Sequence, residues 1–309
     1  MFRFLIGRLL QGLLVLFALY TITFFLAKAM PGEPFTSEKN VSAETKSNIR
    51  KLYGLDKPIW EQYLIYPKNI ITEGSFGTST SKGRAVGDII AQSFPNSLLL
   101  GLCALGFAVG IGVPIGVLSA VRRNTWVDWS CMAIAMVGIC VPSFTIGPLL
   151  QIYFAAHVPG LKVAGWGSPQ DVLLPAFTLG LVSAAYLARL TRGGILEVLS
   201  QDFVRTARAK GLSPSKVIIK HSLRGGLIPA VAYLGPAFAA LISGSFIVET
   251  IFQVPGMGQH FVNAATTRDE FLLLGVSLFF GFLIVVMNLL ADVLTGLLDP
   301  RVRIAGKAD

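Results

Sequence analysis

Long uncharged runs constrain the fold of this chain more than any other feature. Six such runs, each 17 to 33 residues long, recur along its 309 residues. A helix that crosses a bilayer needs about 20 apolar residues, and a core helix of a water-soluble protein seldom stays uncharged on every face for so long. We therefore predict an all-α polytopic membrane protein with six transmembrane helices. The predicted helices are Leu9–Ala27, Ile89–Val121, Ser130–Ala156, Val172–Ala188, Gly225–Val248 and Phe271–Ala291.

The first run could instead belong to a cleaved signal peptide, because Arg3 and Arg8 precede it and the small residues Ala27 and Ala29 lie at its end. The apolar part of a signal peptide is about 7–15 residues long, however, and this run is longer. Lys28 also interrupts the motif at which cleavage would occur. We interpret residues 1–29 as an N-terminal segment and a retained first transmembrane helix.

The basic residues are distributed unevenly over the segments that join the runs. Fifteen Lys and Arg residues lie in the N-terminus, the second-to-third connection, the fourth-to-fifth connection and the C-terminal tail. The two short loops of the alternate set hold only Lys162 and Arg268. Short loops rich in Lys and Arg stay in the cytoplasm, so both termini are expected to be cytoplasmic. The net charge of +9 is interpreted as a topology signal and an attraction to anionic lipid, and no nucleic-acid partner is expected.

Residues 30–88 are predicted to form an external loop subdomain with short helices. One helix is expected to begin at the N-cap residue Ser42 and to end at Gly54, because a glycine suits the left-handed position after a helix end. A second is expected to start at Pro58. Its amphipathic face would carry Trp60, Tyr63, Leu64 and Tyr66. We favour a place for these aromatic side chains at the membrane interface over contacts with a substrate.

Glycine and proline are frequent within the runs. The second run contains Gly106-x-x-x-Gly110 and Gly112-x-x-x-Gly116, and later runs contain Pro142, Pro148, Pro229 and Pro236. Small residues let helices approach closely, and prolines bend them. Each motif alone indicates tight packing, and together they favour bent helices that enclose a pathway.

Motifs for catalysis or metal binding are missing from the sequence, so the chain is not expected to be an enzyme. It has no phosphate-binding G-x-x-x-x-G-K-[ST] loop, no cluster with metal-ligand spacing and no nucleophile elbow. The three cysteines lie in apolar runs and are expected to pack as small buried residues. The three histidines are scattered over segments expected to be loops.

The acidic residues argue against an ion-driven carrier. Such a carrier usually holds acidic side chains near the middle of the membrane, whereas Glu249 and Asp292 lie near the ends of the fifth and sixth runs. No ring of charges or carbonyl groups indicates an ion pore. The energy source of the pathway is therefore expected to lie in another chain.

The most concentrated basic block is Arg205–Gly226, which has six Lys and Arg residues and no acid. One helical face leads into it, formed by Leu196, Leu199, Phe203 and Ala207. Lys210 suits the last turn of that helix, and Gly211 suits the left-handed residue that follows it.

A second helix is predicted directly after this turn, with Ser213 as its N-cap and Pro214 at its first position. It would end at Gly225–Gly226. Three interpretations compete for this helix pair. It could be held by anionic lipid, it could be a nucleic-acid-binding element, or it could be a rigid knob that docks into a partner protein. We reject the second for a lone element in a chain with six spans.

The spacing from Ala207 through Gly211 to Leu223 resembles the cytoplasmic EAA loop of bacterial ABC importer permeases. That pattern is Glu-Ala-Ala, three residues, Gly, nine residues and Ile-x-Leu-Pro. Arg205 stands for its Glu and Arg224 for its Pro, and both departures are those of the oligopeptide/dipeptide permease branch. The stretches MPGEPF, VPSF, ETIFQVPGMGQ and LLDPR also look like the B-type permeases of this branch.

The resemblance implies the type I ABC importer permease fold, in the plasma (inner) membrane of a bacterium. In that family the permease forms half of a translocation pathway with a second related permease subunit. Two ATPase subunits bind ATP and Mg, so no cofactor is expected in this chain. An external solute-binding protein delivers oligopeptides or dipeptides. Residues 89–309 would then be a five-helix permease core that includes a cytoplasmic coupling loop, residues 197–226.

The resemblance also implies roles for particular residues. Contact with an ATPase is expected for the turn of the coupling loop and its flanks, namely Arg205, Thr206, Ala207, Ala209, Lys210, Gly211, Leu212, Ser213 and Pro214. The stretch VPGMGQ is expected to form a compact outward turn that helps to close an external gate or contacts the binding protein. This second set is Glu249, Pro255, Gly256 and Gly258. By turn chemistry alone, a simple tight connection explains that stretch equally well.

Alternative functions stay open at the level of the sequence. The chain could be an ion-coupled secondary transporter or a membrane scaffold that transports nothing. Peptide is the default substrate of the family, but related importers carry nickel chelates, glutathione or sugars.

Overall fold

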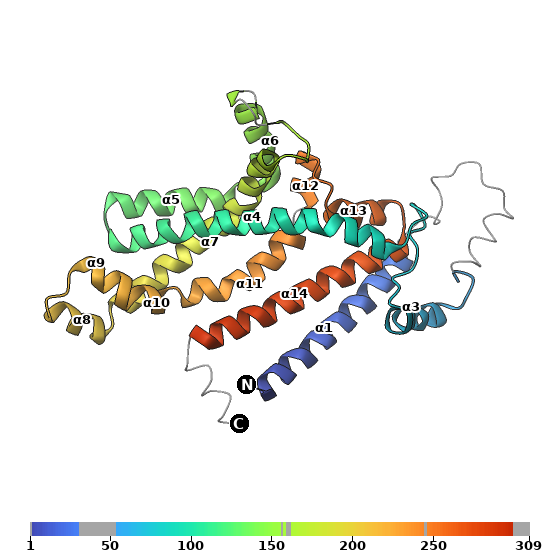
Figure 1. Cartoon of the computed structure of the whole chain (residues 1–309), viewed down its shortest axis with the longest axis horizontal. Coiled ribbons are helices and arrows are strands. Elements are labelled where there is room, and N and C mark those ends of the chain that lie inside the picture. Colours follow the sequence, from blue (N-terminus) through green and yellow to red (C-terminus); the bar gives the residue numbers. More distant parts are fainter. Residues whose placement is uncertain (1, 31–53, 156, 159–161, 244–245, 299–309) are drawn as a thin grey trace. The chain divides into compact units, whose positions relative to one another are not determined.

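The structure of the chain is a computed structural model, which describes residues 2–30, 54–155, 157–158, 162–243 and 246–298. It divides into two compact units. Unit 1 comprises Met1–Leu10, Asn96–Pro255 and Leu283–Asp309, and unit 2 comprises Gln11–Pro95 and Gly256–Phe282. The described residues are mostly helical and contain no strand beyond the isolated bridge between Thr78 and Ala85 (Figure 1). The all-α prediction is confirmed.

Four helices in the described part of the chain are long and apolar enough to cross a membrane. They are α1 (Phe2–Ala29), α4 (Val86–Val121), α7 (Leu173–Leu199) and α14 (Glu270–Leu298). Two bent helix pairs pass the same test, which makes up to six spans if each pair counts as one. This number agrees with the six predicted helices.

The third predicted span, Ser130–Ala156, is not one straight helix. Helix α5 (Trp126–Cys140) ends before Val141, α6 (Ser143–Leu150) starts after Pro142, and the π-helical turn η1 (Gln151–Ala155) follows. The two arms meet at 101°. A proline has no N–H to continue the ladder and forces the residue before it out of helical geometry. Pro142 therefore sets the bend, as the prediction of bent helices anticipated.

The fifth predicted span, Gly225–Val248, is divided among several helices. The segment Pro214–Gly226 meets α11 at 48°. Helix α11 is Ile228–Ser243, and the separate helix α12 is Phe246–Phe252. The continuous span predicted here is therefore wrong in its boundaries, because the turn at Leu227 gives the chain a new direction.

Helix α7 is the central element of unit 1. Helices α5, α6, α11 and α12 all pack on it, and α4 lies beside it (Figure 1). The contact between α4 and α7 is made by glycines, because a β-carbon on Gly112 would lie 2.4 Å from the Ala184 carbonyl oxygen, and one on Gly116 would lie 2.5 Å from that of Ala188. The predicted close approach at Gly112-x-x-x-Gly116 is thus confirmed.

The other small-residue motif of α4 does not mediate a close approach. Within the described residues, a β-carbon on Gly106 or Gly110 would meet nothing within 4 Å. Small residues at this spacing are common in membrane helices whether or not a partner is present. The prediction of tight packing at Gly106-x-x-x-Gly110 is therefore wrong for this chain.

Large apolar side chains point outward from the helices. Leu14 is 69% exposed, Ile134 68% and Ile152 71%. An apolar surface of this kind suits lipid and would be unfavourable in water. Cys103 and Cys140 are also exposed, so the prediction that they are buried packing residues is wrong.

In unit 2, helix α3 (Ile59–Glu73) is attached by aromatic side chains. Tyr66 stacks with Tyr20, and both belong to a buried cluster with Phe24 and Leu274. Pro58 is the N-cap of α3, close to its predicted place, whereas Trp60 is 67% exposed. The predicted helix Ser42–Gly54 lies outside the described residues except for Gly54, which has a φ of +66°.

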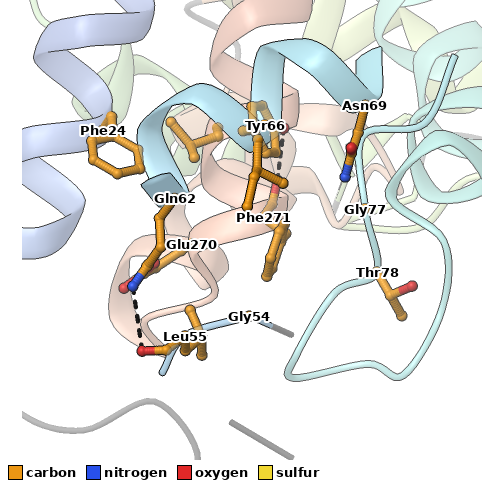
Figure 2. Close-up of a pocket in the computed structure, with 12 residues that line it drawn as sticks. Phe24, Gly54, Leu55, Gln62, Tyr66, Asn69, Gly77, Thr78, Glu270 and Phe271 are labelled. Atoms are coloured by element: carbon orange, nitrogen blue, oxygen red, sulfur yellow. Dashed lines mark hydrogen bonds between the residues drawn. The ribbon is translucent and has the colours of Figure 1, made fainter. Parts of the chain in front are cut away.

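A cavity of about 390 Å³ opens beside this aromatic cluster (Figure 2). Tyr66 and Phe271 line it with apolar surface, and Gln62 and Glu270 give it a polar edge. The ammonium group of Lys28 donates hydrogen bonds to the Gln62 and Glu270 side chains, so this edge is internally paired.

The start of α14 is held by a buried carboxylate. Asp269 is the residue before α14, and its side chain accepts a hydrogen bond from the Leu272 amide, which caps the helix. It also accepts from the hydroxyl of Ser79 and from the amide and hydroxyl of Ser81. Asp269 and Ser79 are both fully buried. This cap therefore fastens the loop before α4 to the last long helix.

Candidate coupling site

The basic block begins where α7 ends. Helix α7 stops at Leu199, and α8 (Asp202–Ala209) starts after the extended residue Gln201. The predicted continuous face from Leu196 to Ala207 is therefore wrong. Because the break rotates α8, Val204 and Ala207 are buried while Phe203 is 52% exposed.

The turn after α8 has the predicted geometry. Gly211 has a φ of +79°, its amide donates to the Arg208 carbonyl at 2.9 Å, and the Leu212 amide donates to the Ala207 carbonyl at 3.3 Å. This pair of hydrogen bonds is a Schellman motif, which satisfies the last carbonyl groups of α8. A glycine adopts the left-handed conformation at no steric cost, so Gly211 fits the C′ position assigned to it.

The second helix starts and ends near the predicted residues. Ser213 is its N-cap and Pro214 its first residue, although within the described residues the Ser213 side chain makes no capping hydrogen bond. Helix α9 (Pro214–Lys216) leads into a π-helical turn, η3 (Val217–Ser222), and α10 (Leu223–Gly226) completes the segment. We call residues 202–226 the coupling hairpin.

The coupling hairpin has a small apolar core of its own. Val204, Ala207 and Val217 are buried together, with Leu199 and Leu212 packed against them. A cleft of about 380 Å³ adjoins this core, lined by Val121 at the end of α4 and by residues of the hairpin. The hairpin is thus a shaped element with a hydrophobic centre, which fits a docking knob better than a loose basic loop.

The residues predicted to contact an ATPase divide into two groups. Ala207 is buried in the hairpin core and Leu212 is half-buried, so these two shape the turn from inside. The remaining seven are exposed, namely Arg205, Thr206, Ala209, Lys210, Gly211, Ser213 and Pro214. The exposed set forms a cationic surface around one tight turn, which is the surface available to a partner protein.

The second predicted site, around VPGMGQ, differs from the expected turn. Gly256 is extended, with a φ of −101° and a ψ of −179°, and it is the N-cap of α13 (Met257–Thr266). Gly258 lies in the first turn of that helix and is buried. The prediction of a compact turn formed by Pro255, Gly256 and Gly258 is therefore wrong. The residue with a left-handed backbone conformation in this segment is Gln253, which has a φ of +54°.

Side-chain hydrogen bonds fix this segment within unit 1. Glu249 is fully buried in α12, and the Ser97 hydroxyl donates to its carboxylate at 2.7 Å. The Asn96 side chain donates to the Pro255 carbonyl at 2.9 Å and accepts from the indole N–H of Trp166. Glu249 and Pro255 are therefore held by α4, and only Pro255 of this pair is exposed.

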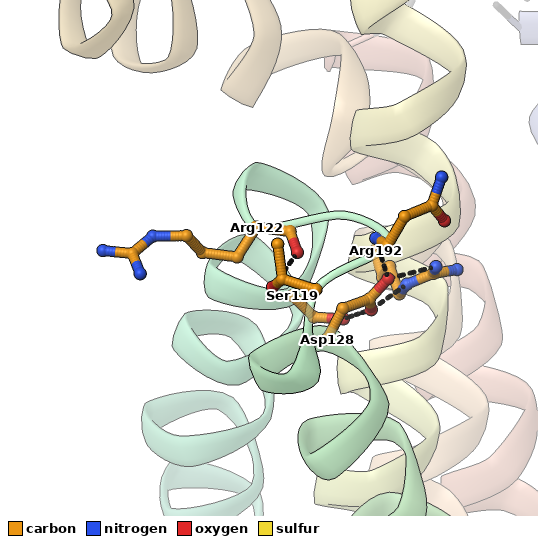
Figure 3. A network of polar contacts seen from close by, with 6 residues as sticks. Ser119, Arg122, Asp128 and Arg192 are labelled. Atoms are coloured by element: carbon orange, nitrogen blue, oxygen red, sulfur yellow. Dashed lines mark hydrogen bonds and ion pairs between the residues drawn. The ribbon is translucent and has the colours of Figure 1, made fainter.

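An ion pair between a buried carboxylate and a partly exposed guanidinium lies close to the root of the coupling hairpin (Figure 3). The Arg192 guanidinium donates to the two carboxylate oxygens of Asp128 at 2.7 and 2.8 Å. The Ser119 hydroxyl and the Asn124 amide also donate to this carboxylate. Asp128 is 3% exposed, so its charge is balanced by four donated hydrogen bonds rather than by water.

Sequence reasoning missed this ion pair. It assigned Arg192 to the connection after the fourth span, whereas α7 continues to Leu199 and contains it. The sequence did hold one indication of it, because Asp128 is an acidic residue directly beside an uncharged run. Acidic side chains within a membrane usually pair with a basic side chain or another polar group. The partner is 64 residues away in the sequence, so spacing alone could not identify it.

Comparison with known proteins agrees with this architecture. The profile of a family described as "Binding-protein-dependent transport system inner membrane component" matches residues 112–304, which is more than half of the chain. The chain belongs to this family. The profile described as "Binding-prot-dependent transport system membrane comp, N-term" matches residues 1–101. Membership of this inner-membrane family, together with the spanning helices, confirms a multi-pass protein of the inner membrane.

Curated relatives of this transport family resemble the chain over its whole length. It is 42% identical to the oligopeptide transport system permease protein OppB of Escherichia coli strain K12, over 98% of this chain and 100% of that protein. The values are the same for OppB of Haemophilus influenzae. The dipeptide transport system permease protein DppB of Bacillus subtilis strain 168 is 40% identical, over 99% of this chain and 100% of that protein.

Solved structures show that the fold is shared with ABC transporters. A chain of the MetNI methionine ABC transporter in an inward-facing conformation matches with a TM-score of 0.57 and 19% identity, over 68% of this chain and 96% of that chain. A chain of an amino acid ABC transporter with histidines matches with a TM-score of 0.51 and 18% identity, over 70% and 94% of the two chains. The predicted type I ABC importer permease fold is confirmed.

Proposed function

We propose that this chain is the permease subunit of an ATP-driven importer and forms half of a translocation pathway for oligopeptides or dipeptides. The observation that carries the proposal is 40–42% identity over nearly the whole chain to permeases named for oligopeptide and dipeptide transport. Identity of this extent covers both the helices and the coupling hairpin.

The partners follow from the family. A second related permease would complete the pathway, two ATPase subunits would bind ATP and Mg, and an external solute-binding protein would deliver the peptide. The chain itself would bind no cofactor and catalyse no reaction. The exposed cations of the coupling hairpin, Arg205, Arg208 and Lys210, support docking on a protein surface, because charges of this kind orient an approaching partner.

The segment around Pro255 is proposed to take part in closing the external gate or in contacting the binding protein. Pro255 and Gln253, which are exposed, would supply the surface, while Glu249 and Gly258 would act from inside, since both are buried. The two hydrogen bonds of Asn96 favour a segment whose conformation is set before any partner arrives.

Reconstitution of the complex in vesicles tests the proposal. The chain is co-expressed with its neighbouring permease and ATPases, and uptake of labelled peptides is measured with ATP and the cognate binding protein. ATP-dependent peptide uptake is the expected result. Uptake by the isolated chain under an ion gradient would instead identify a secondary transporter. A chain that shows no uptake and binds no partner would be identified as a scaffold.

The substrate class is tested separately by the ligands of the cognate binding protein. Peptides of two to several residues are expected to compete for its site. If the binding protein selects a nickel chelate or glutathione, the chain is still an importer subunit, but that compound is its substrate.

A further inference from the structure

The ion pair between Arg192 and Asp128 joins three segments of unit 1. Arg192 belongs to α7, Asp128 to the first turn of α5, and Ser119 to the last turns of α4. Asn124, in the turn between α4 and α5, donates its amide to the same carboxylate at 2.9 Å. One buried carboxylate therefore fixes the α4–α5 turn against α7.

Stability alone is a weak reason for such a pair. Removing the Asp128 carboxylate and much of the Arg192 side chain from water is costly, and apolar side chains of similar volume often stabilise a fold equally well. The arrangement here is also specific, because two guanidinium N–H groups donate one hydrogen bond each to the two oxygens of one carboxylate. A bidentate contact fixes the orientation of both side chains as well as their distance.

The coupling hairpin is rooted on the same stretch of α7. Two residues after Arg192, a β-carbon on Gly194 would lie 2.2 Å from the Gly226 carbonyl oxygen. A β-carbon on Gly226 would in turn lie 2.7 Å from the Ile195 side chain, and Ile195 is fully buried. The last residue of the hairpin is thus in direct backbone contact with α7, next to the residue that holds Asp128.

The other end of the connection is equally close-packed. Gly116 on α4 leaves no space for a β-carbon against Ala188 of α7, and Ser119 follows it by one turn of helix. A displacement of the hairpin would therefore reach α7 through Gly194 and Gly226. It would reach the α4–α5 turn through Arg192 and Asp128.

We propose that Arg192 and Asp128 are positioning residues for energy coupling, which transmit movement of the coupling hairpin to helices α4 and α5. The proposal rests on the proposed function, because it needs a partner ATPase that moves the hairpin. It assigns no contact with peptide or nucleotide to either residue.

Single substitutions in the reconstituted complex test the proposal. Arg192→Gln and Asp128→Asn each remove one charge, and ATP hydrolysis and peptide uptake are measured in the same vesicles. The expected result is ATPase subunits bound as in the wild type and peptide imported per ATP hydrolysed reduced about five-fold or more. Arg189→Gln is the matched control, because Arg189 is exposed on the same helix and its hydrogen bond goes to the Met136 sulfur at 3.9 Å. The control is expected to keep the wild-type ratio.

A double variant keeps the test valid if a lone buried charge prevents assembly. Asp128→Asn combined with Arg192→Gln leaves no unpaired charge, and the two amides can still bond to each other and to Ser119. We expect the double variant to assemble and to import more peptide per ATP than either single variant, since the two residues act as one unit.

Two results would overturn the inference. One is a wild-type ratio in every variant that assembles, which would leave the pair a role in stability only. The other is a double variant whose ratio is the product of the two single losses. Failure of the proposed function is recognised separately, because the wild-type complex would then show no ATP-driven peptide uptake.

Discussion

Gly211 shows how one residue type can decide a local geometry. Its φ of +79° lies in the left-handed region, and no neighbour among the described residues would contact an added β-carbon. Substitution there is therefore limited by backbone conformation and not by space. The turn therefore depends on Gly211 for its backbone conformation, and on other residues, such as Ala207, for its packing.

We predict a graded effect of substitution at Gly211. Val is β-branched and strongly disfavours a positive φ, at a cost of about 1–2 kcal/mol or more, whereas Asn tolerates this region. Gly211→Val should insert in the membrane but import less peptide per ATP, and Gly211→Asn should stay near the wild type. Both are measured in the reconstituted vesicles. Normal uptake by Gly211→Val would disprove the docking role of the turn.

A second prediction at this scale contrasts two glycines of α4. Gly116→Ala places a β-carbon 2.5 Å from the Ala188 carbonyl oxygen, whereas Gly106→Ala meets nothing within 4 Å among the described residues. Forcing an extra methyl group into a packed contact costs about 1–3 kcal/mol. We expect Gly116→Ala to lower the thermal unfolding temperature of the purified chain. Gly106→Ala should leave it unchanged or raise it slightly, because alanine is the better helix former. Equal shifts would show that the contact is not tight in the membrane.

At the scale of elements, the bends were only partly predictable. Pro148 and Pro236 lie inside α6 and α11 without ending them, whereas Pro142 separates two helices. The sequence supplies similar prolines at all three places. Neighbouring helices and side chains can satisfy the backbone groups that a proline leaves free, so the residue type alone does not say which proline ends a helix.

The coupling hairpin shows the same division. Its turn was predictable because Gly211, Ser213 and Pro214 act through neighbours within five residues. The break before α8 was not, because the helical spacing from Leu196 to Ala207 is compatible with one helix. The burial of Val204 in place of Phe203 depends on contacts with Val217, which lies on another helix.

Helix α13 carries a pH-sensitive contact in unit 2. The sequence placed His260 in a loop, but it lies on α13, where its Nδ1 atom accepts from the Lys82 ammonium at 2.8 Å and its Nε2–H donates to Ser93 at 2.9 Å. Burial, together with the positive charges of Lys82 and Arg84, lowers the pKa of His260 to about 4. The folded state therefore keeps this ring neutral.

We predict that this contact weakens as the medium becomes acidic. The unfolded chain binds a proton near the ordinary pKa of 6.5 and the folded chain only near 4, so stability is full above pH 6.5 and falls as the pH drops toward 4. The unfolding temperature should decline over this interval, and less steeply in His260→Gln. Lys82→Gln should also reduce the slope, because it removes one repelling charge. Identical slopes in all three proteins would refute the assignment.

At the scale of the whole molecule, composition predicted the membrane class and the number of crossing segments, because partition into lipid depends on the sum over many residues. It could not predict the ion pair of Asp128 and Arg192, which joins positions 64 residues apart. That contact exists only once α5 and α7 are packed. The family resemblance led to the coupling role that is proposed for the hairpin, which composition left open.

The orientation of the chain remains a prediction, and labelling of single cysteines tests it. With Cys103, Cys131 and Cys140 replaced by Ala, we expect Lys210→Cys to react with a membrane-impermeant maleimide only after the cells are permeabilised. Lys162→Cys should react in intact cells, because it lies in a predicted external loop. The reverse pattern would invert the topology and remove the coupling hairpin from the cytoplasm.

The cap at Asp269 has a consequence for biosynthesis. Its carboxylate satisfies the hydroxyl of Ser79, which is made 190 residues earlier. A ribosome that adds about 5–20 residues per second needs roughly 10–40 s to cover that distance. During this interval the loop containing Ser79 and Ser81 has been synthesised, but the Asp269 carboxylate that accepts its hydrogen bonds has not. The loop around Ser79 can therefore complete its hydrogen bonds only after Asp269 has been synthesised.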